Sequence, residues 1–123
     1  MENGKLKMEN DNVIQNKSFQ FAIRIVKLYQ YLYDLKKEHV LSKQLLRAGT
    51  SIGANVAEAQ QAQSKADFVS KTAIALKEAT ESKYWIELLH ATDYLSQTEY
   101  DSILSDCIEL EKLLTVIVKS SRS

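Results

Sequence analysis

The sequence has no proline and only three glycines, Gly4, Gly49 and Gly53, among its 123 residues. Turns depend on these two residue types, so a β-rich or loop-rich domain of this length would contain more of them. The single cysteine, Cys107, excludes an internal disulfide and suits a reducing compartment. The longest aliphatic run, Leu113–Val118, is far shorter than the ~20 residues of a membrane span, and the polar N-terminus does not resemble a secretory signal. These absences favour a cytoplasmic protein made of long helices, with no membrane partner.

Apolar residues recur at intervals of three and four in four segments, which predicts four amphipathic helices. The first of these apolar stripes consists of Phe21, Ile25, Leu28, Leu32 and Leu35. Ser42 is the expected N-cap of the second helix. Ser64 and Asp67 have the spacing of a capping box for the third helix, and Thr98 and Asp101 have the same spacing for the fourth.

Four helices with short connections predict an all-α fold, an antiparallel up-down-up-down four-helix bundle. We expect this bundle to cover residues 16–119. Residues 1–15 show no sustained apolar period and are predicted to be a disordered arm, and residues 120–123 are predicted to be a C-terminal tail. The length suits a single domain.

The first and third predicted helices carry more apolar residues than one core face requires. At ~100° per residue, a second apolar flank lies beside the core stripe of each helix. The predicted oligomer interface consists of Phe19, Ile23, Val26, Tyr33, Ile74, Trp85 and Leu88. Isolated exposed apolar residues are normal and are the alternative explanation. Because these residues cluster, the pattern favours an interface.

The formal net charge is 0, but the charges are divided between the two halves of the chain. Residues 17–47 contain seven bases and two acids, and residues 58–111 contain eleven acids and four bases. The two halves could neutralise each other within one bundle, or the basic edge of one subunit could meet the acidic edge of the next in a ring. The possible RNA contacts are Lys17, Arg24 and Lys27, with Tyr31 near them for stacking.

No arrangement of residues indicates catalysis. Glu87 and His90 have the Glu-x-x-His spacing of di-iron bundles, but those sites need two such pairs and two further glutamates. Cys107 lies in an apolar stripe, which predicts a buried and inert thiol. The sequence has no glycine-rich phosphate loop, nucleophile elbow or zinc spacing. We therefore expect no enzyme activity, no cofactor and no metal.

The second predicted helix is unusual because two glycines lie on its core side. Each glycine destabilises a helix by about 1 kcal/mol relative to alanine. Their position predicts close approach of a neighbouring helix. A polar strip on the same helix comprises Arg47, Ser51, Asn55 and Glu58. Either this strip is a solvated face, or it forms a hydrogen-bonded network that reaches Glu78 or Glu81 on the third helix.

The segments Arg47–Ala59, Ser64–Phe68 and Ala75–Trp85 carry a family resemblance. With their Asn-x-Ala-Glu and Glu-x-x-Tyr-Trp motifs, they resemble the bacterial four-helix-bundle family that includes proteins encoded within intervening sequences of 23S ribosomal RNA genes. The resemblance implies a ring-shaped homopentamer and no established activity. A related branch assists reverse transcriptases and binds nucleic acid, but that branch is strongly basic and this chain is neutral.

Two functional hypotheses follow. The first is a non-enzymatic, homo-oligomeric scaffold or adaptor, pentameric by resemblance, whose main partner is a further copy of itself. The alternative is an accessory protein associated with RNA, the ribosome or a nucleic-acid-processing protein, which would use its basic first hairpin.

Overall fold

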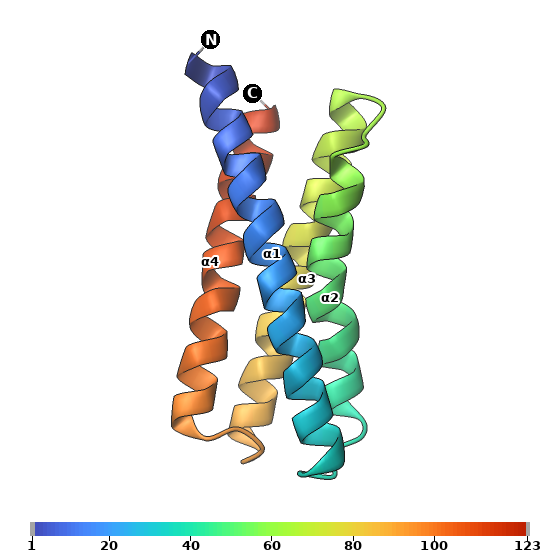
Figure 1. Ribbon diagram of the computed structural model, residues 1–123, viewed down its shortest axis with the longest axis vertical. Coiled ribbons are helices and arrows are strands. Elements are labelled where there is room, and N and C mark those ends of the chain that lie inside the picture. Colours follow the sequence, from blue (N-terminus) through green and yellow to red (C-terminus); the bar gives the residue numbers. More distant parts are fainter. Residues whose placement is uncertain (1, 123) are drawn as a thin grey trace.

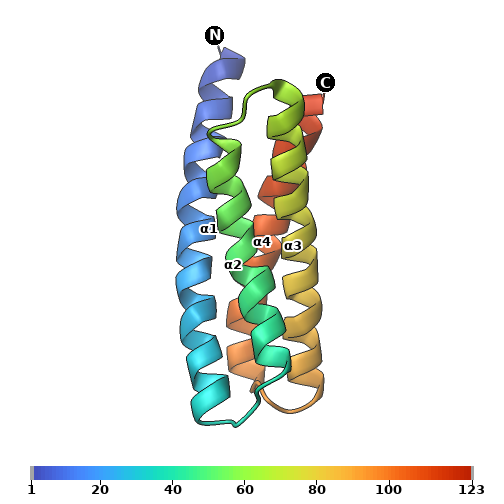
Figure 2. The ribbon, with the colours of Figure 1, turned by 90° about the vertical axis from the view of Figure 1, so that its right-hand side faces the viewer.

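The computed structural model describes the backbone of residues 2–122 and the side chains of residues 12–122. Its helices are α1 (Glu2–Asp34), α2 (Leu41–Ala59), α3 (Lys65–Ala91) and α4 (Gln97–Arg122). Successive helices run in opposite directions, and each packs against two neighbours, with α1 between α2 and α4 (Figures 1 and 2). The predicted all-α, up-down-up-down four-helix bundle is therefore confirmed.

The core lies along the axis of the bundle and receives one stripe from each helix. Its largest fully buried side chains include Phe21, Ile25, Leu32, Leu45, Ile52, Ile86, Leu89, Leu110 and Leu114. Full burial of one such side chain stabilises the fold by about 1.5–3 kcal/mol. The structure corrects one member of the predicted first stripe. Leu35 is 72% exposed, because α1 ends at Asp34 and Leu35 lies in the connection that follows.

Both ends of the bundle differ from the predicted boundaries. Residues 2–15, predicted to be disordered, continue α1, and Ile14 is buried in the core, ahead of the predicted start at residue 16. At the other end, α4 extends to Arg122, and Ser121 is buried instead of lying in a tail. Met1 and Ser123 lie outside the described residues. Single buried residues near a helix end are too few to establish a period in the sequence.

Helix α3 begins with the N-cap Ser64, and α4 begins with a reciprocal capping box. The backbone N–H of Asp67 donates to the Ser64 hydroxyl at 3.0 Å, at the position that the sequence predicted. The predicted box of α4 is wrong by two residues. Glu99 N–H donates to the Ser96 hydroxyl at 3.1 Å, and the Glu99 carboxylate accepts from the Ser96 N–H at 2.8 Å. This backbone hydrogen bond holds the pKa of Glu99 below its ordinary value.

The start of α2 is capped in a different way. The predicted N-cap, Ser42, is wrong, because α2 begins at Leu41 and the cap residue Val40 makes no side-chain cap bond. The buried Glu38 carboxylate accepts the N–H groups of Val40, Leu41 and Ser42 at 2.9–3.0 Å. Lys37 before it adopts φ +57°. A carboxylate thus satisfies N–H groups of the first turn that have no partner within the helix.

Candidate functional site

Helices α1 and α2 come close together at the two glycines of α2. A Cβ atom on Gly49 would lie 2.8 Å from Cγ1 of Ile25, and one on Gly53 would lie 3.3 Å from the carbonyl oxygen of Ser18. The first distance is shorter than real Cβ contacts allow. The close helix approach expected from the sequence is therefore present, and it places the α1 backbone beside Gly53.

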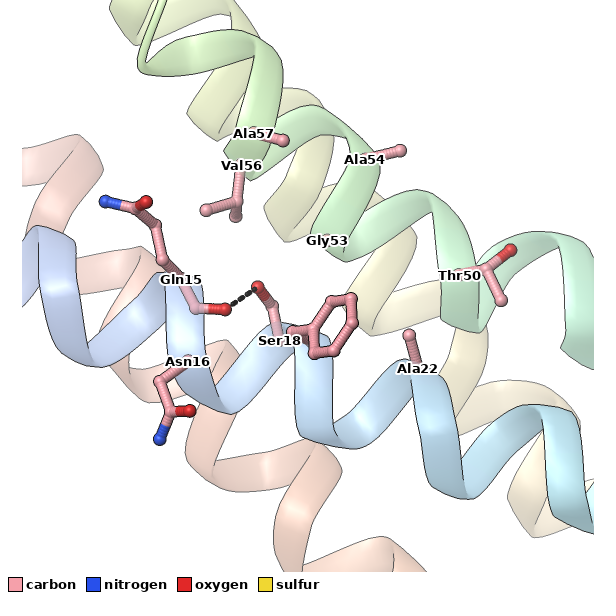
Figure 3. A pocket seen from close by; sticks show the side chains of 10 residues that line it. Gln15, Asn16, Ser18, Ala22, Thr50, Gly53, Ala54, Val56 and Ala57 are labelled. Atoms are coloured by element: carbon pink, nitrogen blue, oxygen red, sulfur yellow. Dashed lines mark hydrogen bonds between the residues drawn. The ribbon is translucent and has the colours of Figure 1, made fainter.

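Beside this contact, α1 and α2 leave a hollow of about 620 Å³ (Figure 3). We define the α1/α2 groove by the small residues that line it, Ala22, Thr50, Gly53, Ala54 and Ala57. Larger side chains line it as well, namely Gln15, Asn16, Phe19 and Val56. The hydroxyl of Ser18 donates to the carbonyl oxygen of Gln15 at 3.2 Å, as the dashed line in Figure 3 marks. This polar group is thereby satisfied within its own helix, so the groove presents mainly apolar walls.

An exposed apolar stripe continues from the groove along α1. We define the α1 stripe by Phe19, Ile23 and Val26, which are 64%, 36% and 39% exposed. Tyr33, which the sequence grouped with them, is half-buried, and its ring lies 5.5 Å from that of Tyr29. The α1 stripe is the most exposed part of the predicted interface.

Helix α3 carries a second set of uncovered apolar side chains. We define the α3 ridge by Ile74, Tyr84 and Leu88, of which Ile74 is 38% and Tyr84 58% exposed. Leu88 is half-buried. The residues of this ridge have large side chains, in contrast to the small residues of the α1/α2 groove.

Trp85 departs from its predicted position. The sequence placed Trp85 away from the core, but it is half-buried and packs against the core edge. Its indole N–H donates to the Glu81 carboxylate at 2.9 Å, and the Tyr84 ring lies edge-on at 5.1 Å. A side chain as large as tryptophan can lie on a flank of a helix and still reach the core edge. Tyr84, which the sequence did not select, is the more exposed aromatic residue.

The polar strip of α2 joins α3 at its two ends. The Arg47 guanidinium pairs with Glu81 and, at 3.2 Å, with Glu78, and Glu58 pairs with Lys71 at 3.3 Å. Between them, the Ser51 hydroxyl donates to the Arg47 carbonyl at 2.6 Å, and the Asn55 amide donates to the Ser51 carbonyl at 2.8 Å. The middle of the strip therefore bonds to its own helix. Only Arg47 and Glu58 link the two helices.

Two of the three possible RNA contacts are engaged within the subunit. Lys17 pairs with Glu109 at 2.9 Å, and Arg24 pairs with Asp106 at 2.6 Å, both across the seam between α1 and α4. Lys27 is exposed. The divided charges thus meet at this seam inside one bundle, which was one of the two arrangements that the sequence left open.

Aromatic and basic residues gather where α1 meets α2. The rings of Tyr33 and His39 lie 4.1 Å apart, and Lys43 lies 5.7 Å from the Tyr33 ring. Lys36 lies 5.8 Å from the ring of Tyr31. Within the described residues, no ring contact joins these two groups, and Tyr31 and Lys36 lie beside Glu99 of α4. We use the name aromatic-lysine cluster for the two groups together. The sequence pattern did not reveal it because its members come from two helices and their connection, although the alternating tyrosines of α1 were a visible signal.

The residues considered for catalysis take part in packing contacts within the bundle. The Cys107 thiol is fully buried and lies 3.3 Å from the Ala79 carbonyl, and burial raises its pKa to about 12. The His90 ring stacks on Tyr100 with centroids 3.9 Å apart. Across the part of the chain that the structure describes, no three His, Cys, Asp or Glu side chains gather as a metal site would require. Within the same part, no helix has both the length and the apolar character of a membrane span.

The topology and these surfaces define a small four-helix-bundle protein with uncovered apolar faces. The chain belongs to the family of 23S rRNA-intervening sequence proteins, whose family model matches residues 10–116. It is similar to a crystal structure of a protein of unknown function from the S23 ribosomal protein family of Bacteroides thetaiotaomicron. The two are 56% identical with a TM-score of 0.88, over 89% of this chain and 98% of the other. No curated protein matches the chain.

Proposed function

We propose that the chain is a non-enzymatic scaffold or adaptor of the cytoplasm that works as a homo-oligomer. The observation that carries this proposal is the pair of uncovered apolar faces, the α1 stripe with its groove and the α3 ridge. One core stripe per helix already fills the bundle. The exposed parts of the additional apolar residues are therefore free to contact another molecule.

Contact with another subunit explains these faces in energetic terms. Removing apolar surface from water contributes about 25 cal/mol per Å², and clustered apolar patches usually mark contact sites. The described residues contain no cluster of metal-ligating groups, and the thiol is buried and protonated. Both facts support a contact function more than a catalytic one.

Sedimentation equilibrium of the purified chain tests the proposal. The subunit has a mass of 14.0 kDa, so the pentamer suggested by the family resemblance has a mass of five times that value, about 70 kDa. A mass well above one subunit at micromolar concentration is expected. A monomer at that concentration contradicts the proposal.

A second candidate function is association with RNA, and the aromatic-lysine cluster favours it. Exposed lysines can contact phosphates, and tyrosine rings can stack on unpaired bases. The cluster is a better candidate for RNA contact than Lys17 and Arg24, because acidic residues of α4 already pair with these two side chains. The net charge of 0 and the acidic second half of the chain oppose strong binding.

Titration with a fluorescent single-stranded RNA tests this candidate. We expect weak and salt-sensitive binding that falls further in Lys36→Gln/Lys43→Gln, while Lys112→Gln, on α4, leaves it unchanged. Submicromolar binding at 0.15 M salt would make RNA association the leading function. Binding that the two lysine substitutions do not weaken would remove the cluster from consideration.

A further inference from the structure

Another hollow, of about 350 Å³, lies on the seam between α3 and the last turns of α4, which run side by side (Figure 2). We define the α3/α4 groove by the residues that line this hollow, Ala73, Leu76, Lys77, Thr80, Val118 and Arg122. Its floor is apolar, because Ala73 and Leu76 are half-buried and Val118 is buried. Each wall carries one exposed cation, Lys77 on α3 and Arg122 on α4.

The acids nearest to the α3/α4 groove are already engaged. Glu111 of α4 accepts a hydrogen bond from Thr80 at 3.0 Å and pairs with Lys83 at 3.8 Å. On the opposite side of α3, Glu78 and Glu81 both pair with an arginine of α2. None of these carboxylates is therefore left to neutralise the cations on the walls of the groove.

The cations of the groove, in contrast, have no counter-ion. Among the described residues, no ion pair includes Lys77 or Arg122, and Lys119 adds a further exposed cation three residues before Arg122. The remaining acids of α3 lie away from the groove. Asp67 bonds to the backbone of the α2–α3 connection, and Glu87 follows Lys77 by ten residues, about 15 Å along the helix axis. The groove is therefore a cationic surface on a chain of zero net charge.

We propose that the α3/α4 groove binds an acidic amphipathic helix of a partner protein. This inference rests on the proposed adaptor function and names the kind of partner. From Ala73 to Thr80 the floor is about 10 Å long at 1.5 Å per residue, which is the length of two helical turns. Apolar residues on one face of a helix can dock on such a floor. A helix lying in the seam has Lys77 on one flank and Arg122 on the other, so the matching partner carries acids on both sides of its apolar stripe.

The apolar floor favours a protein helix over RNA as the occupant. Cations alone are sufficient for phosphate contacts, but Leu76 and Val118 would then lie beneath a charged backbone. Stacking on unpaired bases needs aromatic rings, and none is among the described side chains that line this groove. Burial of the floor would supply affinity, and the cations of the walls would select the acidic partner.

Fluorescence anisotropy with two designed peptides tests this docking. Both peptides are helices of about 15 residues with leucine at positions i, i+4 and i+7. One carries glutamate on both sides of the leucines, and the other carries lysine at the same positions. Lys77→Glu/Arg122→Glu reverses the charge of the groove, and Lys77→Arg/Arg122→Lys preserves it. Lys43→Glu is the matched control, because Lys43 is exposed on α2, outside the groove. Sedimentation velocity gives the mass of each protein in the same samples.

The glutamate peptide should bind the wild type at least about tenfold more tightly than the lysine peptide does. Charge reversal at Lys77 and Arg122 should weaken that binding by about tenfold or more, whereas the charge-preserving variant and Lys43→Glu should bind like the wild type. Equal binding of the two peptides, or full binding by the charge-reversed variant, overturns the docking.

Two further outcomes would assign the α3/α4 groove to a different occupant and overturn the docking. One is a charge-reversed variant that loses its oligomeric mass, which would place the groove between subunits. The other is a single-stranded RNA that binds the wild type and not the charge-reversed variant, while the glutamate peptide does not bind. A monomeric wild type that still binds the glutamate peptide contradicts self-association and leaves the docking intact.

Discussion

Helix α1 contacts α4 and α2 in chemically different ways, and we call these two contacts the charged seam and the glycine seam. Toward α4, α1 presents Lys17 and Arg24, which pair with Glu109 and Asp106. Toward α2, it packs Ile25 against Gly49 and leaves an apolar groove beside that contact. The charges of the charged seam are paired within one subunit, whereas the glycine seam adjoins an apolar surface that is exposed in the subunit. This contrast shows which face of the bundle is available for a partner.

The largest expected effect comes from breaking the glycine seam. Gly49→Leu forces a side chain into Ile25, where even a Cβ atom is too close, and should lower the free energy of unfolding by about 3 kcal/mol or more. Gln44→Leu, at an exposed position of the same helix outside the groove, should change it by less than about 0.5 kcal/mol. Urea denaturation measures both. Equal losses would mean that the seam is not close-packed at Gly49.

Trp85→Ala should affect both the subunit and its assembly. The ring packs against the core edge and holds Tyr84 of the ridge, so we expect a loss of about 2 kcal/mol in unfolding free energy and a similar loss in assembly. Trp85→Phe keeps most of the ring and should lose less of each. Denaturation and sedimentation are compared for the two variants. If Trp85→Ala assembled normally, Trp85 would not support assembly through the α3 ridge.

Glu38→Gln tests the connection between α1 and α2, where the Glu38 carboxylate caps the start of α2. The substitution removes the charge that accepts N–H groups at the start of α2 and should lower the unfolding free energy by about 1.5–2 kcal/mol. Glu87→Gln, on the exposed surface of α3, is the control and should have little effect. Thermal unfolding measures both. Similar melting temperatures for the two variants would contradict the capping role.

The smallest effect is expected at the charged seam. Arg24→Gln breaks an exposed ion pair with Asp106, and such pairs contribute about 0.2–1 kcal/mol. The loss should shrink further at 1 M salt, because screening acts over about 3 Å there. Assembly should be unchanged. If Arg24→Gln dissociated the oligomer, the charged seam would belong to the subunit contact after all.

The repeating features of the fold could be predicted from the sequence, and the single contacts could not. Stripes such as Phe21, Ile25 and Leu32 repeat with the helical period, so four helices and their core faces followed directly. Both glycines of α2 indicated close packing because they lie on its core side. A period needs several turns to become visible. Ile14 lies seven residues before Phe21 with the polar Ser18 between them, so it was not recognised as part of the stripe.

In the candidate site, too, the repeating apolar pattern could be predicted and the single contacts could not. Counting apolar residues on each helix selected Phe19 and Ile74, which are exposed. It selected Trp85 and not Tyr84. At ~100° per residue Tyr84 lies opposite the buried stripe of α3, whereas Trp85 lies on the flank, from which its large ring reaches the core edge. Nor did the pattern reveal that Glu38 caps α2, since that contact follows from the left-handed turn at Lys37. Side-chain reach and turn geometry are tertiary properties that a helical period does not contain.

We expect a second copy to cover the apolar face of α1, and a comparison of two variants tests this expectation. Phe19 and Val116 are both large, exposed and apolar, at 64% and 54%, and only Phe19 adjoins the groove. The masses of Phe19→Glu and Val116→Glu are compared by sedimentation equilibrium. We expect a 14.0 kDa monomer for Phe19→Glu and wild-type assembly for Val116→Glu. Wild-type assembly of Phe19→Glu would contradict it.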